Sequence, residues 1–286
     1  TGAETDVIVY ANYVVGGKTY KTKIGDGISF GFSYMFANKG NIKTIKFSDG
    51  LDTSTVTNMA GMFYNCNSLL SVVFGNNFNT SNVTNISGMF SGCAALAELD
   101  LNSFDTSNVT DMNQMFGNCA ALAELDLSNF NTSNVTNMDS MFSGCAALAE
   151  LDLSNFNTSN VTNMNSMFSR CAALAELDLS NFNTSNVTNM NSMFSRCAAL
   201  AELDLSNFNT SNVTMMASMF EKCTSLAELD LSSFDTSNVT NMASMFRSNS
   251  NLKTIYATNG KWSTAKAGST ATYMFYNCGT SSVTYK

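Results

Sequence analysis

The sequence predicts a repeat solenoid, and three observations predict it. Residues 145–170 and residues 171–196 are identical over all 26 positions. A Met-Phe pair occurs ten times, the first at Met35 and the last at Met274, at steps of 27, then 26 and finally 29 residues. Six successive units, between residues 96 and 231, also carry the pattern Leu-x-x-Leu-x-Leu. A fixed period in this range is typical of stacked turns that bury their apolar faces against their neighbours, so we expect about ten turns.

The two ends of the chain differ from the repeats between them. Residues 1–30 are rich in β-formers, and Gly16-Gly17 within them is a hairpin signal. An open solenoid end exposes apolar side chains and unpaired backbone, so it requires a cap. We therefore predict a β-rich N-terminal cap over residues 1–30, the repeat array over residues 31–250, and a degenerate last repeat or cap over residues 251–286.

Within one unit, the residue pattern predicts three kinds of local structure. Leucines alternate with acidic residues over 148–153, which predicts a short strand and, after stacking, a parallel sheet on one side of the array. Asn-Thr-Ser-Asn at 157–160 predicts a polar turn, and a second short extended piece follows over 161–164. Met, Phe and Cys at helical spacing over 165–171 predict a helical or 3-10 turn on the other side.

The repeated apolar positions predict continuous buried columns, because every turn must share one core with its neighbours. One column is leucine and the other is phenylalanine. Their members are Leu99, Leu125, Leu151, Leu177, Leu203 and Leu229 in the first, and Phe104, Phe130, Phe156, Phe182, Phe208 and Phe234 in the second.

The composition excludes several classes of function. The net charge is −8, and the 14 basic residues lie mostly near the ends, so we expect no nucleic-acid partner. The chain has no histidine, which removes the usual general base and the usual metal ligand. No segment approaches the roughly 20 apolar residues of a membrane span. The first residues lack the basic and apolar regions of a signal peptide, and we expect no cofactor.

The order of motifs within the unit resembles a known family. LDLS, then F-[DN]-T-S-N-V-T, then MF-x-x-C recur as in the 26-residue repeats of BspA-like leucine-rich-repeat surface proteins, which occur in mycoplasmas, lactobacilli and other gut or oral bacteria. The resemblance spans roughly residues 31–280. It implies a right-handed solenoid displayed on a cell surface, in a family regarded as adhesins or as surface proteins of unknown role. The chain as given carries neither a lipoprotein cysteine at its start nor a wall-sorting motif at its end.

Eight cysteines recur with the repeats. An even count in a secreted protein suggests disulfides. Equivalent side chains in stacked turns point the same way, however, whereas a disulfide needs Cβ atoms that approach each other. We therefore expect free buried thiols that fill space as small apolar groups. They are Cys66, Cys93, Cys119, Cys145, Cys171, Cys197, Cys223 and Cys278.

Two columns of carboxylates are the candidate partner-binding face. They stand two residues apart on the predicted strand, and therefore on one side of it. They would attract a cationic partner or weakly held Ca²⁺. The alternative is a solvated face that keeps the array soluble and prevents sideways pairing. The residues are Glu98, Asp100, Glu124, Asp126, Glu150, Asp152, Glu176, Asp178, Glu202, Asp204, Glu228 and Asp230.

The Asn-x-Ser/Thr triplets of the polar turn allow two interpretations. They match the glycosylation acceptor pattern, for example at Asn131 and Asn134. They also suit ladders in which stacked amides and hydroxyls satisfy the backbone of the turns, and we favour these ladders.

The function that this sequence predicts is non-enzymatic. Identical turns supply the same groups repeatedly, whereas catalysis needs unlike groups in one arrangement. We expect an extracellular surface or adhesion module that binds a protein or glycan on a host or neighbouring cell. The first alternative is a structural subunit that assembles end to end into a surface fibre. The second is a glycan-active enzyme, which would need a unique cleft with paired carboxylates.

Overall fold

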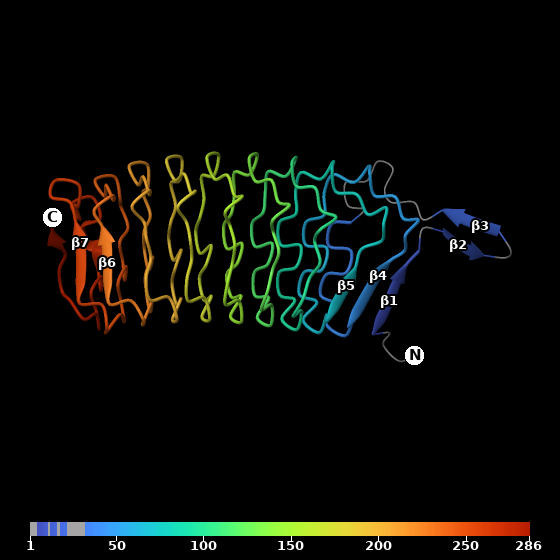
Figure 1. The fold of residues 1–286 in the computed structure, drawn as a ribbon, viewed down its shortest axis with the longest axis horizontal. Helices are drawn as coiled ribbons and strands as arrows, with labels where there is room; N and C mark the ends of the chain where they lie inside the picture. Colours follow the sequence, from blue (N-terminus) through green and yellow to red (C-terminus); the bar gives the residue numbers. More distant parts are fainter. Residues whose placement is uncertain (1–4, 11, 16–17, 22–31) are drawn as a thin grey trace.

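The structure is a computed structural model that describes residues 5–10, 12–15, 18–21 and 32–286. It is an elongated stack of turns that follow one another from the N-terminal (blue) to the C-terminal (red) end (Figure 1). The predicted repeat solenoid is confirmed. Successive turns are joined by parallel backbone bridges along one column: Asn58, Asn85, Asp111, Asn137, Asn163, Asn189, Met215 and Asn241.

Regular strands lie at the two ends of the array, as far as the structure describes it. One parallel sheet has the order β1-β4-β5, and another has the order β6-β7-β8. An antiparallel hairpin, β2-β3, projects beyond β1 and confirms the hairpin predicted around Gly16-Gly17 (Figure 1). The elements are β1 (Asp6–Val9), β2 (Asn12–Val15), β3 (Lys18–Lys21), β4 (Thr44–Phe47), β5 (Ser71–Val73), β6 (Glu228–Leu231), β7 (Thr254–Ala257), the short 3-10 helix η1 (Gly268–Ala271) and β8 (Thr284–Tyr285).

The prediction of a parallel sheet along one whole side of the array is wrong for the central turns. Over 149–153, for example, no amide forms a backbone hydrogen bond with any described residue. The strands that do pair never place one carboxylate beside another: Glu228 pairs with Thr254, and Asp230 with Tyr256. In the central turns each acidic residue would stand opposite another acidic residue, and like charges directly opposite one another disfavour pairing.

The helical or 3-10 turn predicted over 165–171 is also replaced by another structure. Ser166 and Arg170 have positive φ, 55° and 64°, which no right-handed helix contains. The amides of Ser166, Phe168 and Arg170 donate instead to carbonyls of the following turn, at 2.8, 2.9 and 2.7 Å. We call this repeated set of three bonds the Met-Phe ladder. The Met-Phe ladder forms in place of a helix because its hydrogen bonds join every turn to the next one.

The core lies behind the Met-Phe ladder and runs the length of the stack. The phenylalanine rings of the Met-Phe pairs are stacked, with centroids 5.8 Å apart between Phe142 and Phe168. The predicted column from Phe104 to Phe234 is confirmed, since every member is buried. In the predicted leucine column, three members are buried and three, Leu99, Leu125 and Leu203, are partly buried against the core.

The polar turn is held by side chains that bond to the backbone of neighbouring turns, which confirms the predicted ladders. Thr158 is fully buried; its hydroxyl donates to the carbonyl of Asn183 at 3.0 Å and accepts from the amide of Asn183 at 2.8 Å. The Asn160 side chain donates to the carbonyl of Ser133 at 2.7 Å. The same buried threonine recurs at Thr53, Thr80, Thr106, Thr132, Thr158, Thr184, Thr210 and Thr236.

The eight cysteines are free in the structure, and the predicted burial is confirmed for seven of them, Cys278 being partly exposed. The thiol of Cys171 donates to the carbonyl of Phe142 at 3.2 Å, and the same bond recurs along the column. Burial raises the pKa of Cys145 and of Cys197 to about 12. These thiols therefore stay protonated and act as small buried donors.

Candidate functional site

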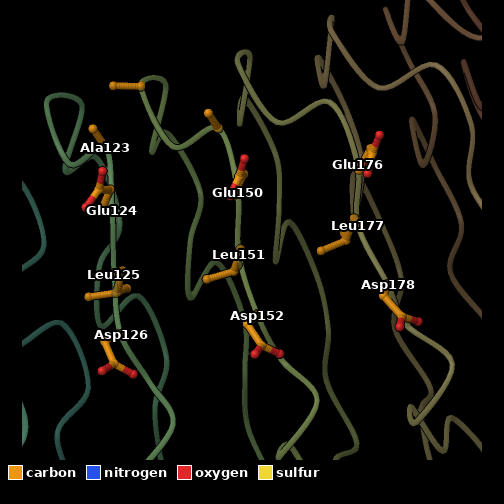
Figure 2. Close-up of a pocket in the computed structure, with 12 residues that line it drawn as sticks. Ala123, Glu124, Leu125, Asp126, Glu150, Leu151, Asp152, Glu176, Leu177 and Asp178 are labelled. Atoms are coloured by element: carbon orange, nitrogen blue, oxygen red, sulfur yellow. The ribbon is translucent and has the colours of Figure 1, made fainter.

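The acidic face consists of the twelve carboxylates named above, six glutamates and six aspartates. All twelve are exposed, and the leucine between each Glu and Asp points to the core side. Figure 2 shows Glu124, Glu150 and Glu176 in one row and the aspartates two positions on in a second row. This is the geometry that the alternating pattern predicts, although the backbone between the turns is unpaired.

A shallow groove follows the acidic face across successive turns. Its largest section has a volume of about 770 Å³ and is lined by residues 123–126, by Ala147 and Ala149–Asp152, and by Glu176–Asp178 (Figure 2). Similar sections of about 590 and 470 Å³ lie on either side along the array. The groove thus presents carboxylates, small apolar alanine side chains and unpaired backbone amides together.

The aspartate row has a structural role that the sequence analysis missed. Asp152 accepts a hydrogen bond from the amide of Ser154 at 2.9 Å, and each aspartate of the row makes the same contact two residues on. The amide and hydroxyl of Ser154 lower the pKa of Asp152, although Asp178 and Asp126 oppose this. Hydrogen bonding therefore outweighs like-charge repulsion. The Asp-Leu-Ser triplet of the LDLS motif could have predicted this turn, because an aspartate side chain often accepts from the amide two residues on.

The glutamate row differs from the aspartate row. No described residue donates a hydrogen bond to Glu124, Glu150 or Glu176, and all three are exposed. Since glutamates hold none of the turns together, they are the members of the acidic face that a partner can engage without disturbing the fold.

Lys286 contacts Asp230, the last aspartate of the acidic face. The Lys286 ammonium lies 2.8 Å from a carboxylate oxygen of Asp230 and 3.6 Å from the centre of the Tyr256 ring. The Lys286 hydrogen bond is the largest cause that lowers the pKa of Asp230 to about 2. Sequence reasoning missed this contact because 56 residues separate the two side chains.

Two features are absent from the described part of the chain. No helix there has the length and apolar character to cross a membrane. No three acidic or cysteine side chains in those residues gather closely enough to hold a metal ion, and the weakly held Ca²⁺ stays a prediction.

A family model described as "Mycoplasma protein of unknown function, DUF285" matches three overlapping stretches, residues 31–149, 118–202 and 171–284. The chain belongs to this family. Its resemblance to BspA-like leucine-rich-repeat surface proteins is confirmed. No curated protein matches this DUF285 chain in sequence.

One solved structure supports the same fold class for this DUF285 chain, and two further structures resemble it less closely. A leucine-rich repeat protein from Bacteroides ovatus aligns with 88% of the chain, at a TM-score of 0.57 and 19% identity. The chain spans 63% of the length of that protein. A leucine rich cell surface protein from Faecalibacterium prausnitzii aligns with the whole chain and 88% of its own length at a TM-score of 0.41 and 19% identity. A leucine-rich repeat protein from T. pallidum aligns with 59% of the chain and 69% of its own length at a TM-score of 0.40 and 20% identity.

Proposed function

We propose that the chain is a non-enzymatic module displayed outside the cell or on its surface, where the acidic face binds a protein or glycan on a host or neighbouring cell. The observation that carries this proposal is the serial groove lined by exposed carboxylates. No described basic side chain forms an ion pair with the glutamate row, and only Glu228 lies near one, Lys286, so the summed field attracts cationic partners. We also propose that the solenoid is right-handed and has about ten turns.

The repeated groove also supports binding rather than catalysis. Six successive turns present the same pair, Glu and Asp, and small apolar alanines line the groove beside them, so the face offers several equivalent contacts in a row. Equivalent weak contacts along one rigid surface add up to a strong attachment. A partner with regularly spaced positive charge, such as a basic protein segment or an amino-sugar glycan, fits this surface.

The test neutralises the middle of the acidic face and measures attachment. The triple variant Asp152→Asn, Asp178→Asn and Asp204→Asn keeps an oxygen that accepts the serine amide, so the turns are preserved. Binding to host-cell surfaces or matrix proteins is compared at low and high salt. We expect the parent to bind better at low salt and the variant to lose that advantage.

A matched control removes the same number of charges elsewhere. Asp52→Asn, Asp105→Asn and Asp235→Asn change aspartates that make the same amide contact but stand outside the acidic face. The proposal expects normal attachment for this control. If the acidic-face variant binds as well as the parent at every salt concentration, the acidic face is a solubilising surface, and the binding role is wrong.

A further inference from the structure

Three successive inner turns carry a basic side chain at the last position of the Met-Phe ladder. They are Arg170, Arg196 and Lys222, and their φ angles of 64°, 65° and 61° show one repeated backbone conformation. The two arginines are exposed, and the lysine is half-buried. The turns just before and just after them carry Gly144 and Ser248 at this position, so the feature belongs to these three turns alone. We call the three residues the basic column.

The basic column has no ion-pair partner among the described residues. Side chains at this position of the repeat come close to one another between turns. Asn38 and Asn65, at the same position of two earlier turns, are joined by a side-chain hydrogen bond of 3.2 Å. The three cations of the basic column, one turn apart, therefore repel one another. A partner that supplies negative charge at the same spacing would relieve this repulsion.

A turn of two alanines separates the basic column from the glutamate row. Ala172 and Ala173 form this corner in one repeat, with Arg170 shortly before it and Glu176 shortly after it. Figure 2 shows the same order in an earlier repeat, where Glu124 lies nearer to the corner loop than Asp126. We call the row of corners along these three turns the ridge. The ridge has positive charge along one side and negative charge along the other.

We propose that two copies of this chain pair side by side, ridge to ridge, as a two-fold dimer with parallel stacks. A half-turn rotation about an axis parallel to the stack exchanges the two sides of the ridge and leaves every turn at its own height. The basic column of each copy then faces the glutamate row of the other. In chain order, Arg170, Arg196 and Lys222 of one copy face Glu176, Glu202 and Glu228 of the other.

The repeat makes this parallel arrangement the favoured one. Both copies have the same rise per turn, so three opposite-charge contacts on each side of the dimer are in register at once. An antiparallel pair would set one glutamate row against the other, and facing like charges disfavour a contact. The alanines of the corner are small, so two ridges can approach closely. Each copy uses the same patch, so the contact closes at two copies.

Pairing leaves most of the acidic face open. The aspartate row and the glutamates Glu98, Glu124 and Glu150 lie outside the contact, and the rotation places the two acidic faces on opposite sides of the dimer. A dimer therefore offers the cationic partner proposed above two binding faces. The pairing itself needs no such partner, so it is tested with the purified chain alone and stands or falls separately from the proposed attachment.

Charge reversal tests the pairing. One variant carries Arg170→Glu, Arg196→Glu and Lys222→Glu, and a second variant carries Glu176→Lys, Glu202→Lys and Glu228→Lys. In sedimentation at low salt, the mass of the parent should rise with concentration, and added salt should reverse this. Each variant alone should associate at least about tenfold more weakly than the parent.

An equimolar mixture of the two variants should associate again, because each reversed row then faces an opposite charge. Both variants keep a negative net charge, since the parent carries −8, so attraction between whole molecules does not explain a recovery. A parent that stays monomeric at low salt and high concentration overturns the proposal, and so does a mixture no heavier than its two components. A monomeric parent that binds heparin through the basic column also overturns it and assigns the column to an anionic polymer.

A cysteine on the ridge tests the geometry and leaves all charges in place. In the two-fold pair Ala172 lies at the same height as Ala172 of the other copy. Ala172→Cys, in a Cys278→Ala background that removes the partly exposed native thiol, should therefore give a disulfide-linked dimer under mild oxidation. The matched control is Thr162→Cys, an exposed position beside the polar turn and away from the ridge, which should stay monomeric. If a triple reversal unfolds the chain, this comparison decides, and equal cross-linking at the two positions contradicts the ridge contact.

Discussion

The side-chain amide nitrogen of Asn249 lies 2.7 Å from the carbonyl oxygen of Phe220. In seven other turns a cysteine thiol donates the equivalent hydrogen bond from the same position. The amide oxygen of Asn249 is buried and has no partner among the described residues. The residue thus continues the donor column of the cysteines but adds one unsatisfied acceptor to the core.

Asn249→Cys should raise the free energy of unfolding by about 1–3 kcal/mol, because it restores the donor and removes the buried unpaired oxygen. Urea unfolding followed by fluorescence measures the change. The reverse substitution, Cys223→Asn, should lower stability by a similar amount. If Asn249→Cys destabilises the array, the amide oxygen has a role that the column of thiols does not explain.

Thr158→Val should lower the free energy of unfolding by about 1–3 kcal/mol, since it removes the buried hydroxyl that bonds to both the amide and the carbonyl of Asn183. The matched control is Thr162→Val, which removes an exposed hydroxyl that donates to the carbonyl of Thr136 at 3.2 Å. The control should lose about 1 kcal/mol or less. Equal losses for the two variants would show that burial of the threonine column is unimportant.

Arg170→Gly should stabilise the array by about 0.5–1 kcal/mol, because a non-glycine residue at φ 64° is strained and glycine is not. Gly144→Ala, at the same position one turn earlier, should destabilise it by at least about 1 kcal/mol. Gly144 has a φ of 80°, and an added Cβ would stand 2.6 Å from the Asn118 side-chain oxygen. Thermal unfolding of both variants checks these opposite signs, and a destabilising Arg170→Gly contradicts them.

Acid should destabilise the array through the aspartate row. The folded pKa values of Asp126, Asp152, Asp178 and Asp204 are lowered, first by the serine amides, and that of Asp230 is lowered to about 2. A lowered folded pKa gives stability that is present above the unfolded value, near pH 4, and is lost as pH falls through the folded value.

Urea midpoints at about pH 5 and about pH 2.5 measure this loss. The variant with Asp152→Asn, Asp178→Asn and Asp204→Asn carries no titrating group at those positions. It should therefore lose less stability than the parent over the same interval. An equal loss in both proteins would mean that the acid sensitivity lies outside the aspartate row.

Sequence periodicity predicted the stack, the buried phenylalanine column and the exposure of the acidic face, because each of these depends only on which positions repeat. The polar ladders of the Asn-Thr-Ser-Asn turn were predicted as well, but periodicity could not predict which other segments hydrogen-bond between turns. Leu-x-Leu alternation is the same for a paired strand and for the unpaired segment around Leu151. Met164, Met167 and Phe168 have helical spacing, yet Ser166 has a left-handed conformation. In the residue types only Gly61 and Gly88, at the equivalent position of earlier turns, mark it.

The long-range contacts were equally hidden from the sequence. Lys286 reaches Asp230 only because the last strand returns beside β7. The sequence therefore predicts the columns and the polar ladders, whereas the Met-Phe ladder is seen only in the backbone geometry.

Amide hydrogen exchange tests most directly the central claim, which is that the Met-Phe and polar ladders hold the central turns together and leave the acidic face open. The exchange is measured by residue-level mass spectrometry. Peptides from the identical repeats 145–170 and 171–196 have the same sequence, so each measured rate is the average of the two repeats. The amides of Phe168 and Thr162 should exchange slowly, and those of Leu151 and Asp152 should exchange orders of magnitude faster. Slow exchange of Leu151 and Asp152, equal to that of Phe168, would mean that a continuous sheet lies under the acidic face, and would contradict the account.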